Sequence, residues 1–139
     1  MDLDDERHCF GCGERNPIGL KLKFSRTEDG VETIFTPDKS HQGCRDLLHG
    51  GLMALVLDEA MVNAVWLSGT PAVPVDIRVR LRQAVRVGET LRIRARIVGN
   101  QKRLVMTRAE ATDSSDRLVA EAEAKCLRTA PADKKKSRS

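Results

Sequence analysis

Apolar and polar residues alternate strictly through the second half of the chain, in segments separated by turn residues. The segments are 75–85, 91–98, 103–111 and 117–127. Successive side chains of a strand point to opposite faces of a sheet, so each segment predicts a strand with one apolar and one polar face. Gly88, Gly99-Asn100 and the stretch 113–116 supply the turns. We therefore expect a long antiparallel sheet.

The same alternation predicts a hairpin near the N-terminus. Residues 20–26 and 31–36 alternate on either side of a turn at Glu28-Asp29-Gly30. A polar loop, 38–46, follows this hairpin. The stretch 47–69 comes next and is the only long segment with helical character, so it predicts one helix between the two groups of strands.

The predicted helix is unusual because it is apolar all round. From position 52 to 67 its only polar side chains are Asp58, Glu59 and Asn63. Such a helix is normally buried, so we expect the sheet or a partner subunit to surround it. Burying a carboxylate without a partner costs several kcal/mol or raises its pKa, which makes Asp58 a functional candidate. Glu59 and Asn63 lie four positions apart and predict a solvent-facing or dimer-edge strip.

The element order is therefore β-β-α-β-β-β-β, which predicts an α+β fold with a single long helix. A chain of 139 residues is long enough for one domain with a substantial core. We place this domain at residues 9–129. An acidic leader at 1–8 precedes it, and a basic tail at 130–139 with the composition of a disordered segment follows it.

Charge and targeting signals narrow the possible partners. The net charge is +4, and residues 78–108 carry nine arginines and one lysine with Glu89 as the only acid. This block contains no aromatic residue, so stacking platforms for bases are missing and we expect no nucleic-acid partner. The acidic N-terminus does not resemble a signal peptide, and no run approaches the roughly 18 apolar residues of a membrane helix. We expect a cytoplasmic protein with no membrane partner and reduced cysteines.

His49-Gly50-Gly51 stands where the helix is expected to begin. Two glycines let backbone N–H groups approach a ligand, and a helix N-terminus favours an anion or a developing oxyanion. For this tripeptide alone, a flexible joint between loop and helix is an equally good interpretation.

Residues 49–61, HGGLMALVLDEAM, resemble the motif of hotdog-fold thioesterases of the phenylacetate-pathway and 4-hydroxybenzoyl-CoA thioesterase type. In that family an acidic catalytic residue follows the motif His by nine positions, and Asp58 stands there. The strand order also matches the hotdog fold, in which a curved antiparallel sheet wraps a long central helix. The leader CFGCGERNPIGLKLKF resembles that of one subgroup. The resemblance covers residues 9–128 and implies an acyl-CoA thioesterase with two sites at a two-fold dimer interface.

Helix geometry gives an independent argument for a dimer. Nine residues at 1.5 Å rise separate His49 from Asp58 by roughly 13 Å along the axis. This is too far for both to reach one carbon, so Asp58 must meet the helix start of a second copy if they act together. In this composite site the Gly50 or Gly51 amide would polarise the thioester carbonyl, with His49 orienting the loop or contacting the thioester. Asp58 would act as general base on water or as nucleophile.

The resemblance implies no cofactor for catalysis, but the phosphates of coenzyme A would need cations. Lys102 and Arg103, at the tip of a predicted hairpin, are candidates, as are Arg80 and Arg82. The predicted outer sheet face carries six arginines: Arg78, Arg80, Arg82, Arg92, Arg94 and Arg96. Packing two such faces back to back would be costly. We therefore expect a homodimer, or a tetramer joined through other surfaces.

The sequence departs from the family pattern at two positions. Relatives often carry Asn or Gln six residues before the motif His, where this chain has Gly43 with Gln42 adjacent. Some place Ser or Thr two residues before an aspartate that Asp76 resembles, and here that residue is Pro74. These departures favour a non-catalytic acyl-CoA-binding protein as the main alternative. A hotdog dehydratase or hydratase and a small zinc-bearing nucleic-acid binder are further alternatives.

The pair Cys9-x-x-Cys12 admits two interpretations. A redox role is disfavoured because no strand-to-helix context surrounds the pair. Reduced, buried cysteines are one interpretation, and structural zinc is the other. For zinc, the ligands would be Cys9, Cys12, His41 and Cys44, which together offer three thiolates and an imidazole. Such a site would fasten the leader to the loop that ends in His49.

Overall fold

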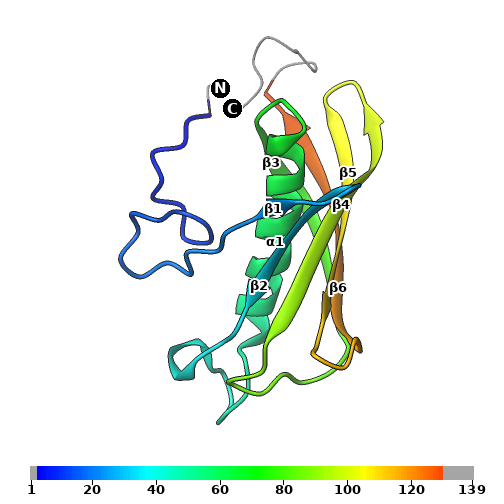
Figure 1. Cartoon of the computed structure of the whole chain (residues 1–139). Helices are drawn as coiled ribbons and strands as arrows, with labels where there is room; N and C mark the ends of the chain where they lie inside the picture. The colour runs from blue at the N-terminus through cyan, green and yellow to red at the C-terminus, as the bar shows by residue number, and fades with distance from the viewer. Residues whose placement is uncertain (1–2, 130–139) are drawn as a thin grey trace.

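A computed structural model describes residues 3–129. One long helix, α1 (Gly50–Leu67), lies against a curved six-stranded antiparallel sheet (Figure 1). The strands are β1 (Ser25–Arg26), β2 (Gly30–Phe35), β3 (Ala72–Leu81), β4 (Leu91–Gln101), β5 (Leu104–Thr112) and β6 (Leu118–Arg128), and a 3-10 helix, η1 (Lys39–His41), precedes α1. The spatial strand order is β1-β2-β4-β5-β6-β3. The predicted element order and α+β hotdog fold are therefore confirmed, while the predicted tail at 130–139 lies outside the described residues.

The alternation of residues explains how the sheet covers the helix. In β4 the apolar residues Leu91, Ile93 and Ala95 are buried, whereas the arginines between them are exposed. Seven residues of α1 are buried against this apolar face: Met53, Val56, Leu57, Ala60, Met61, Ala64 and Val65. Burying a side chain of the Leu or Met class contributes about 1.5–3 kcal/mol, so this layer dominates the core.

The expectation that no segment approaches a membrane helix in length and apolar character is wrong for helix α1. With 18 residues it is long and apolar enough, by length and composition, to cross a membrane. In the structure it instead packs against strands β2 to β6 and forms the centre of the core. A core helix and a membrane helix share this composition, so hydropathy alone does not distinguish them.

Strand β3 closes one end of the sheet and pairs only with β6 in the described part of the chain. Its apolar side chains are poorly covered: Val75 and Leu81 are each 57% exposed, and Ile77 is 40% exposed. An unpaired edge of ten residues with exposed apolar side chains is normally covered by another chain or element. Strand β3 therefore presents an uncovered surface beside the start of α1.

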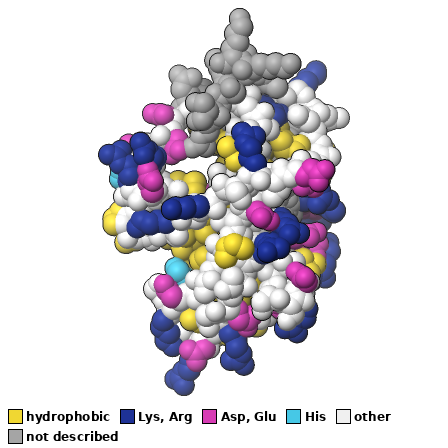
Figure 2. All heavy atoms as spheres, viewed as in Figure 1, with side chains coloured by type: hydrophobic (Ala, Val, Ile, Leu, Met, Phe, Trp, Pro, Cys, Tyr) yellow, Lys and Arg dark blue, Asp and Glu magenta, His cyan; other side chains and the backbone are white. Residues whose placement is uncertain are grey.

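The outer face of the sheet is less uniformly basic than residues 78–108 suggest. Glutamates from neighbouring strands lie between the arginines, with Arg82 Nη2 3.0 Å from Glu121 and Arg94 Nε 3.2 Å from Glu32. Basic and acidic side chains are likewise interspersed over the face shown in Figure 2. The arginine layer is partly compensated by acids that are distant in the sequence.

The first predicted strand is shorter than expected, because its residues bond elsewhere. Only Ser25–Arg26 forms β1, whereas the prediction spanned 20–26. The Leu20 and Leu22 amides instead donate to the carbonyls of Phe10 and Gly11. Residues 20–22 thereby attach to the leader, a loop that stands out beside α1 in Figures 1 and 2.

Candidate functional site

The start of α1 is held by a loop that folds back on itself. The His49 amide donates to the His41 carbonyl at 2.9 Å, and the Leu48 amide donates to the Val85 carbonyl at 2.8 Å. His49 has extended backbone and is the N-cap of α1, where its Nδ1 accepts a hydrogen bond of 2.9 Å from the Gly51 amide. This is the usual arrangement of a capping side chain, which satisfies one orphan donor of the first turn.

The cap separates the roles of the two glycines. The Gly51 amide is engaged by His49, whereas the Gly50 amide donates no hydrogen bond within the described part of the chain. Position 50 also approaches the exposed edge strand, since a Cβ there would lie 2.9 Å from Cδ1 of Leu81. Gly50 therefore offers a free N–H at the positive end of the helix, next to the uncovered surface of β3.

Asp58 lies two and a half turns further along α1, partly buried. Its Oδ1 is buried without a hydrogen-bond partner. Burial, and secondarily the charge of Glu59, raise the pKa of Asp58 to about 6. The charge of Asp58 in turn contributes to raising the pKa of the buried Cys126 thiol on β6, although burial is the larger cause. Burying a carboxylate oxygen without a partner costs free energy, and the desolvation makes the group a stronger base.

One chain does not bring Asp58 and His49 together. They share one straight helix, and the rise between them is roughly 13 Å. The helix start and Asp58 therefore belong to the same site only if a second copy supplies one of them.

The structure shows what surrounds Gly43 and Pro74, the two positions that depart from the family pattern. A Cβ at Gly43 would lie 3.2 Å from Cα of His49, so residue 43 packs directly beside the cap. The neighbouring Gln42 side chain accepts from the Asp46 amide inside the loop. Pro74 lies in β3 opposite Cys126, where the strand register shifts. Neither position places a hydroxyl or a free amide side chain beside Asp58 or His49.

The predicted coenzyme A contacts lie at the hairpin between β4 and β5. Lys102 is exposed, in a left-handed turn conformation with φ 51°. Arg103 is exposed but engaged, since Nε donates to the Arg128 carbonyl and Nη2 to the Thr129 carbonyl. Of the other candidates, Arg82 pairs with Glu121 and Arg80 is exposed. Lys102 and Arg80 are thus the freer cations of this set.

The four predicted zinc ligands do not lie together in the described part of the chain. Nδ1 of His41 accepts from the Asp38 amide in the capping box of η1, and Cys44 is exposed. Within residues 3–129, Cys9 and Cys12 instead group with Glu59, with all three ligand atoms within 4.8 Å of one another. The leader loop packs on the middle of α1 rather than on the loop that precedes it.

The sequence does not identify Glu59 as a site residue, because its spacing to Asn63 predicts a solvent-facing or dimer-edge strip. The thiol of Cys9 donates to Oε1 of Glu59 at 3.1 Å, across 50 positions of sequence. Burial and the Glu59 charge raise the pKa of the Cys12 thiol far above its usual value. The Asn63 side chain, predicted to share the Glu59 face, donates to the Glu59 carbonyl. No short-range pattern could have predicted the contact with the leader.

Comparison with known families identifies the fold's relatives. The family model described as Thioesterase superfamily matches residues 46–120, more than half of the chain. The chain belongs to this superfamily. The match begins in the loop before His49 and continues through α1 into β6, so it includes both halves of the candidate site. The sequence shows no match among curated proteins.

Solved structures with the same fold match this chain at low identity. A Streptococcus mutans protein bound to acetyl-CoA is 17% identical, with a TM-score of 0.76 over 86% of this chain and 98% of its own. A hypothetical thioesterase from Streptococcus pneumoniae with coenzyme A is 18% identical, with a TM-score of 0.74 over 81% and 91%. The Escherichia coli PaaI protein, from the phenylacetic acid degradation operon, is 19% identical, with a TM-score of 0.75 over 81% and 83%. At these identities the likeness shows the shared hotdog fold.

Proposed function

We propose that this protein hydrolyses acyl-CoA thioesters at two composite sites of a homodimer. The observation that carries the proposal is the partly buried Asp58 carboxylate in an apolar helix, with Oδ1 buried and unpartnered. Two facts support the substrate class: membership of the thioesterase superfamily, and the coenzyme A ligands of two relatives with the same fold.

The uncovered edge of β3 is where the second copy would bind. Val75, Ile77 and Leu81 are exposed there, and Leu81 lies beside Gly50. Pairing two β3 edges by a two-fold axis would bury these side chains and satisfy the free edge. Such pairing would also bring the helix start of one chain toward Asp58 of the other. A shared site needs this approach, because His49 and Asp58 of one chain lie roughly 13 Å apart along the helix axis.

In the proposed reaction a water attacks the thioester carbon while Asp58 takes its proton. The carbonyl oxygen becomes an oxyanion, which the Gly50 amide and the positive end of α1 stabilise. The tetrahedral intermediate then collapses with cleavage of the carbon–sulfur bond. The sulfur of coenzyme A leaves with the proton returned by Asp58, giving a carboxylic acid and the free thiol. His49 holds the first turn through the Gly51 amide and thereby positions Gly50.

A non-catalytic acyl-CoA-binding protein is the second candidate, and Pro74 and Gly43 favour it. Both positions lack the side chains that the family pattern leads us to expect near the reacting water or the motif His. The deciding experiment is a hydrolysis screen over short-chain, long-chain and aromatic acyl-CoAs, with binding to each measured in parallel. Turnover that Asp58→Asn abolishes supports the enzyme. Binding without turnover of any of these thioesters would support the binding protein.

A further inference from the structure

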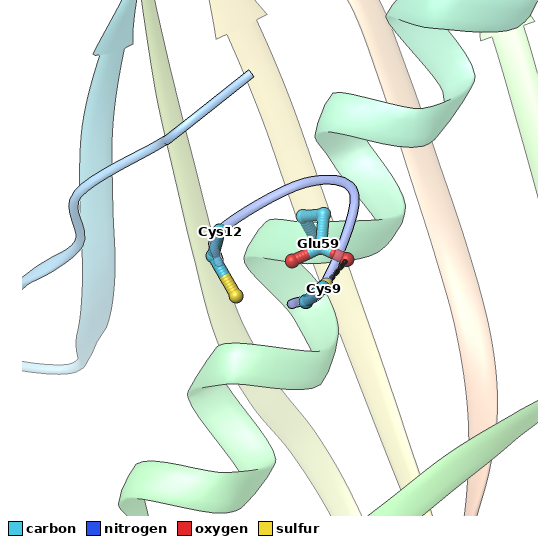
Figure 3. A group of neighbouring side chains, drawn as sticks. All are labelled: Cys9, Cys12 and Glu59. Carbon is cyan, nitrogen blue, oxygen red and sulfur yellow. Dashed lines mark hydrogen bonds between the residues drawn. The ribbon is translucent and has the colours of Figure 1, made fainter. Parts of the chain in front are cut away.

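The leader carries a second cluster of reactive side chains, separate from the proposed hydrolytic site. Cys9 and Cys12 come from its loop, and Glu59 comes from the middle of α1 (Figure 3). The loop arches over the Glu59 carboxylate, and the Cys9 thiol donates to one of its oxygens at 3.1 Å. The sulfur and oxygen atoms of all three residues lie within 4.8 Å of one another.

Two glycines allow this close approach of the loop to α1. A Cβ at Gly11 would lie 2.1 Å from Cγ of Glu59, so with any other residue either the Glu59 side chain or the loop would have to shift. A Cβ at Gly13 would lie 2.4 Å from the Cys9 amide nitrogen, inside the turn that the Gly13 amide closes on the Cys9 carbonyl. The sequence Cys-x-Gly-Cys-Gly therefore holds both thiols against Glu59.

Apart from this cluster, the loop is held mainly by backbone hydrogen bonds. Its base is closed by a hydrogen bond from the Arg15 amide to the Arg7 carbonyl, but its large apolar residues face solvent. Phe10 is 38% exposed and Ile18 is 76% exposed. Segments this short rarely build a core of their own and are commonly held by a disulfide or a metal.

The cluster also lacks a positive charge. Glu59 is half-buried, and no ion pair to its carboxylate occurs within residues 3–129. Asp58, the next residue toward the N-terminus, has no ion pair there either. A half-buried carboxylate beside two thiols is the environment that a divalent cation stabilises, because the cation supplies the missing charge and keeps coordinated thiols as thiolates.

We propose that Cys9, Cys12 and Glu59 bind one zinc ion, with solvent in the fourth position, and that this ion fastens the leader to the middle of α1. Two thiolates favour zinc over magnesium or calcium, and a carboxylate suits zinc better than copper(I). With Zn–S near 2.3 Å and Zn–O near 2.0–2.2 Å, tetrahedral ligand atoms would be about 3.5–3.8 Å apart. The observed cluster meets this with small side-chain movements. The proposal does not depend on the hydrolytic function.

The test is metal binding by the full chain, purified under reducing conditions. We expect about one zinc per chain by elemental analysis, and a cobalt(II) complex whose absorption shows thiolate ligation. The changes Cys9→Ser and Cys12→Ser should each remove most of the zinc. Glu59→Gln, which keeps the side-chain volume, should weaken binding by at least about 10–100-fold in a chelator competition.

Cys44→Ser is the matched control, because Cys44 is exposed and outside the cluster. It should leave the zinc content and the cobalt absorption unchanged, as should His41→Gln. Circular dichroism of each variant tests whether α1 and the sheet remain folded. The inference is wrong if the wild-type chain binds neither zinc nor cobalt(II), or if Cys9 and Cys12 form a disulfide under reducing conditions instead of binding metal. It is also wrong if Cys44→Ser loses zinc as Cys9→Ser does.

Discussion

The Gly51 amide donates a hydrogen bond of 2.9 Å to Nδ1 of His49, the residue that caps the same helix. Because of this contact, the amides of Gly50 and Gly51 have different roles. Gly51 holds the cap and the orientation of the imidazole, while the Gly50 amide stays free at the helix start. In the proposed site, His49 positions, Gly50 stabilises the oxyanion and Asp58 activates water, so each group can be changed separately.

Replacing Asp58 by Asn should lower thioester hydrolysis by about 10²–10⁴-fold, the usual contribution of a general base. The matched control is Asp116→Asn at the turn between β5 and β6, where φ is 60° and Asn is well tolerated. That variant should keep wild-type turnover. Full activity of Asp58→Asn in a folded dimer would contradict the assignment.

The same Asp58→Asn variant should not be less stable, despite changing a partly buried residue. Because the folded pKa of Asp58 is raised, the folded state loses stability as the pH rises through the range from its unfolded value to about 6. Above that range the ionised, partly buried carboxylate lowers the stability of the folded state, and Asn removes this destabilisation. Thermal unfolding at pH 8 should therefore give an equal or higher Tm for Asn, and a large decrease would show that Asp58 has a stabilising partner.

The pH dependence of turnover should show a rising limb centred at or above about 6, because Asp58 must be ionised to take a proton. Burial is the main cause of this raised pKa, and dimer formation would bury the group further. The Glu59 carboxylate and the Cys126 thiol are the titratable groups whose charges couple to it. Measuring kcat from pH 4.5 to 9 checks the limb. A limb centred near 4 would mean that the working carboxylate is exposed.

The oxyanion role of Gly50 can be tested by removing only its N–H. Gly50 is the first residue of α1, a position that accepts proline, and ψ of His49 is 129°, which suits a residue before proline. Gly50→Pro should lower kcat by about 10²–10³-fold. Gly50→Ala adds the same Cβ beside Leu81 but keeps the N–H, so it should retain most of the activity. Equal losses in both variants would indicate crowding at Leu81 instead.

Mixing Asp58→Asn chains with Gly50→Pro chains should restore activity. In a two-fold dimer, the heterodimer has one site with both groups intact and one with neither, so it should reach about half of the wild-type rate per dimer. Two tags purified in sequence would isolate the heterodimer. An inactive heterodimer of verified composition would mean that each site lies within one chain.

The edge of β3 should determine the oligomeric state. Ile77→Lys places like charges at the proposed interface and should give a monomer without hydrolysis. The control Ile34→Lys changes an apolar residue that is also exposed, 54% against 40% for Ile77, on β2, which is paired on both sides, and it should remain a dimer. Light scattering with size-exclusion chromatography distinguishes the outcomes. An active, dimeric Ile77→Lys variant would place the interface elsewhere.

The strands of the second half were predictable because alternation is a local property. Leu91, Ile93 and Ala95 are buried as their spacing predicts, and the helix begins at the glycines that the motif marked. The leader was not predictable in the same way. Leu20 and Leu22 alternate like strand residues, but their amides bond to Phe10 and Gly11. Their partners are set by a loop whose position depends on a contact 50 residues away.

In the candidate site, too, some residues could be identified from local sequence and others could not. Asp58 could be singled out because a carboxylate in an apolar helix conflicts with its neighbours, and this conflict is visible in the sequence. Glu59 could not, because its interpretation depended on what covers its face of the helix. His41 and Cys44 were grouped with the cysteines by spacing alone, but the His41 imidazole caps η1 through the Asp38 amide. The capping hydrogen bond and a metal ion would both need the single nitrogen lone pair of the neutral imidazole.

The uncovered edge of β3 has a consequence for how hydrolysis scales with the amount of protein. If each active site takes one half from each chain, a lone chain is inactive however well it folds. At concentrations below the dissociation constant of the pair, the rate rises with the square of the chain concentration rather than in proportion to it. A cell that halved its supply of this protein would then lose about three quarters of the hydrolysis. Thioester turnover would then respond more steeply than in proportion to the expression level, without any effector or modification.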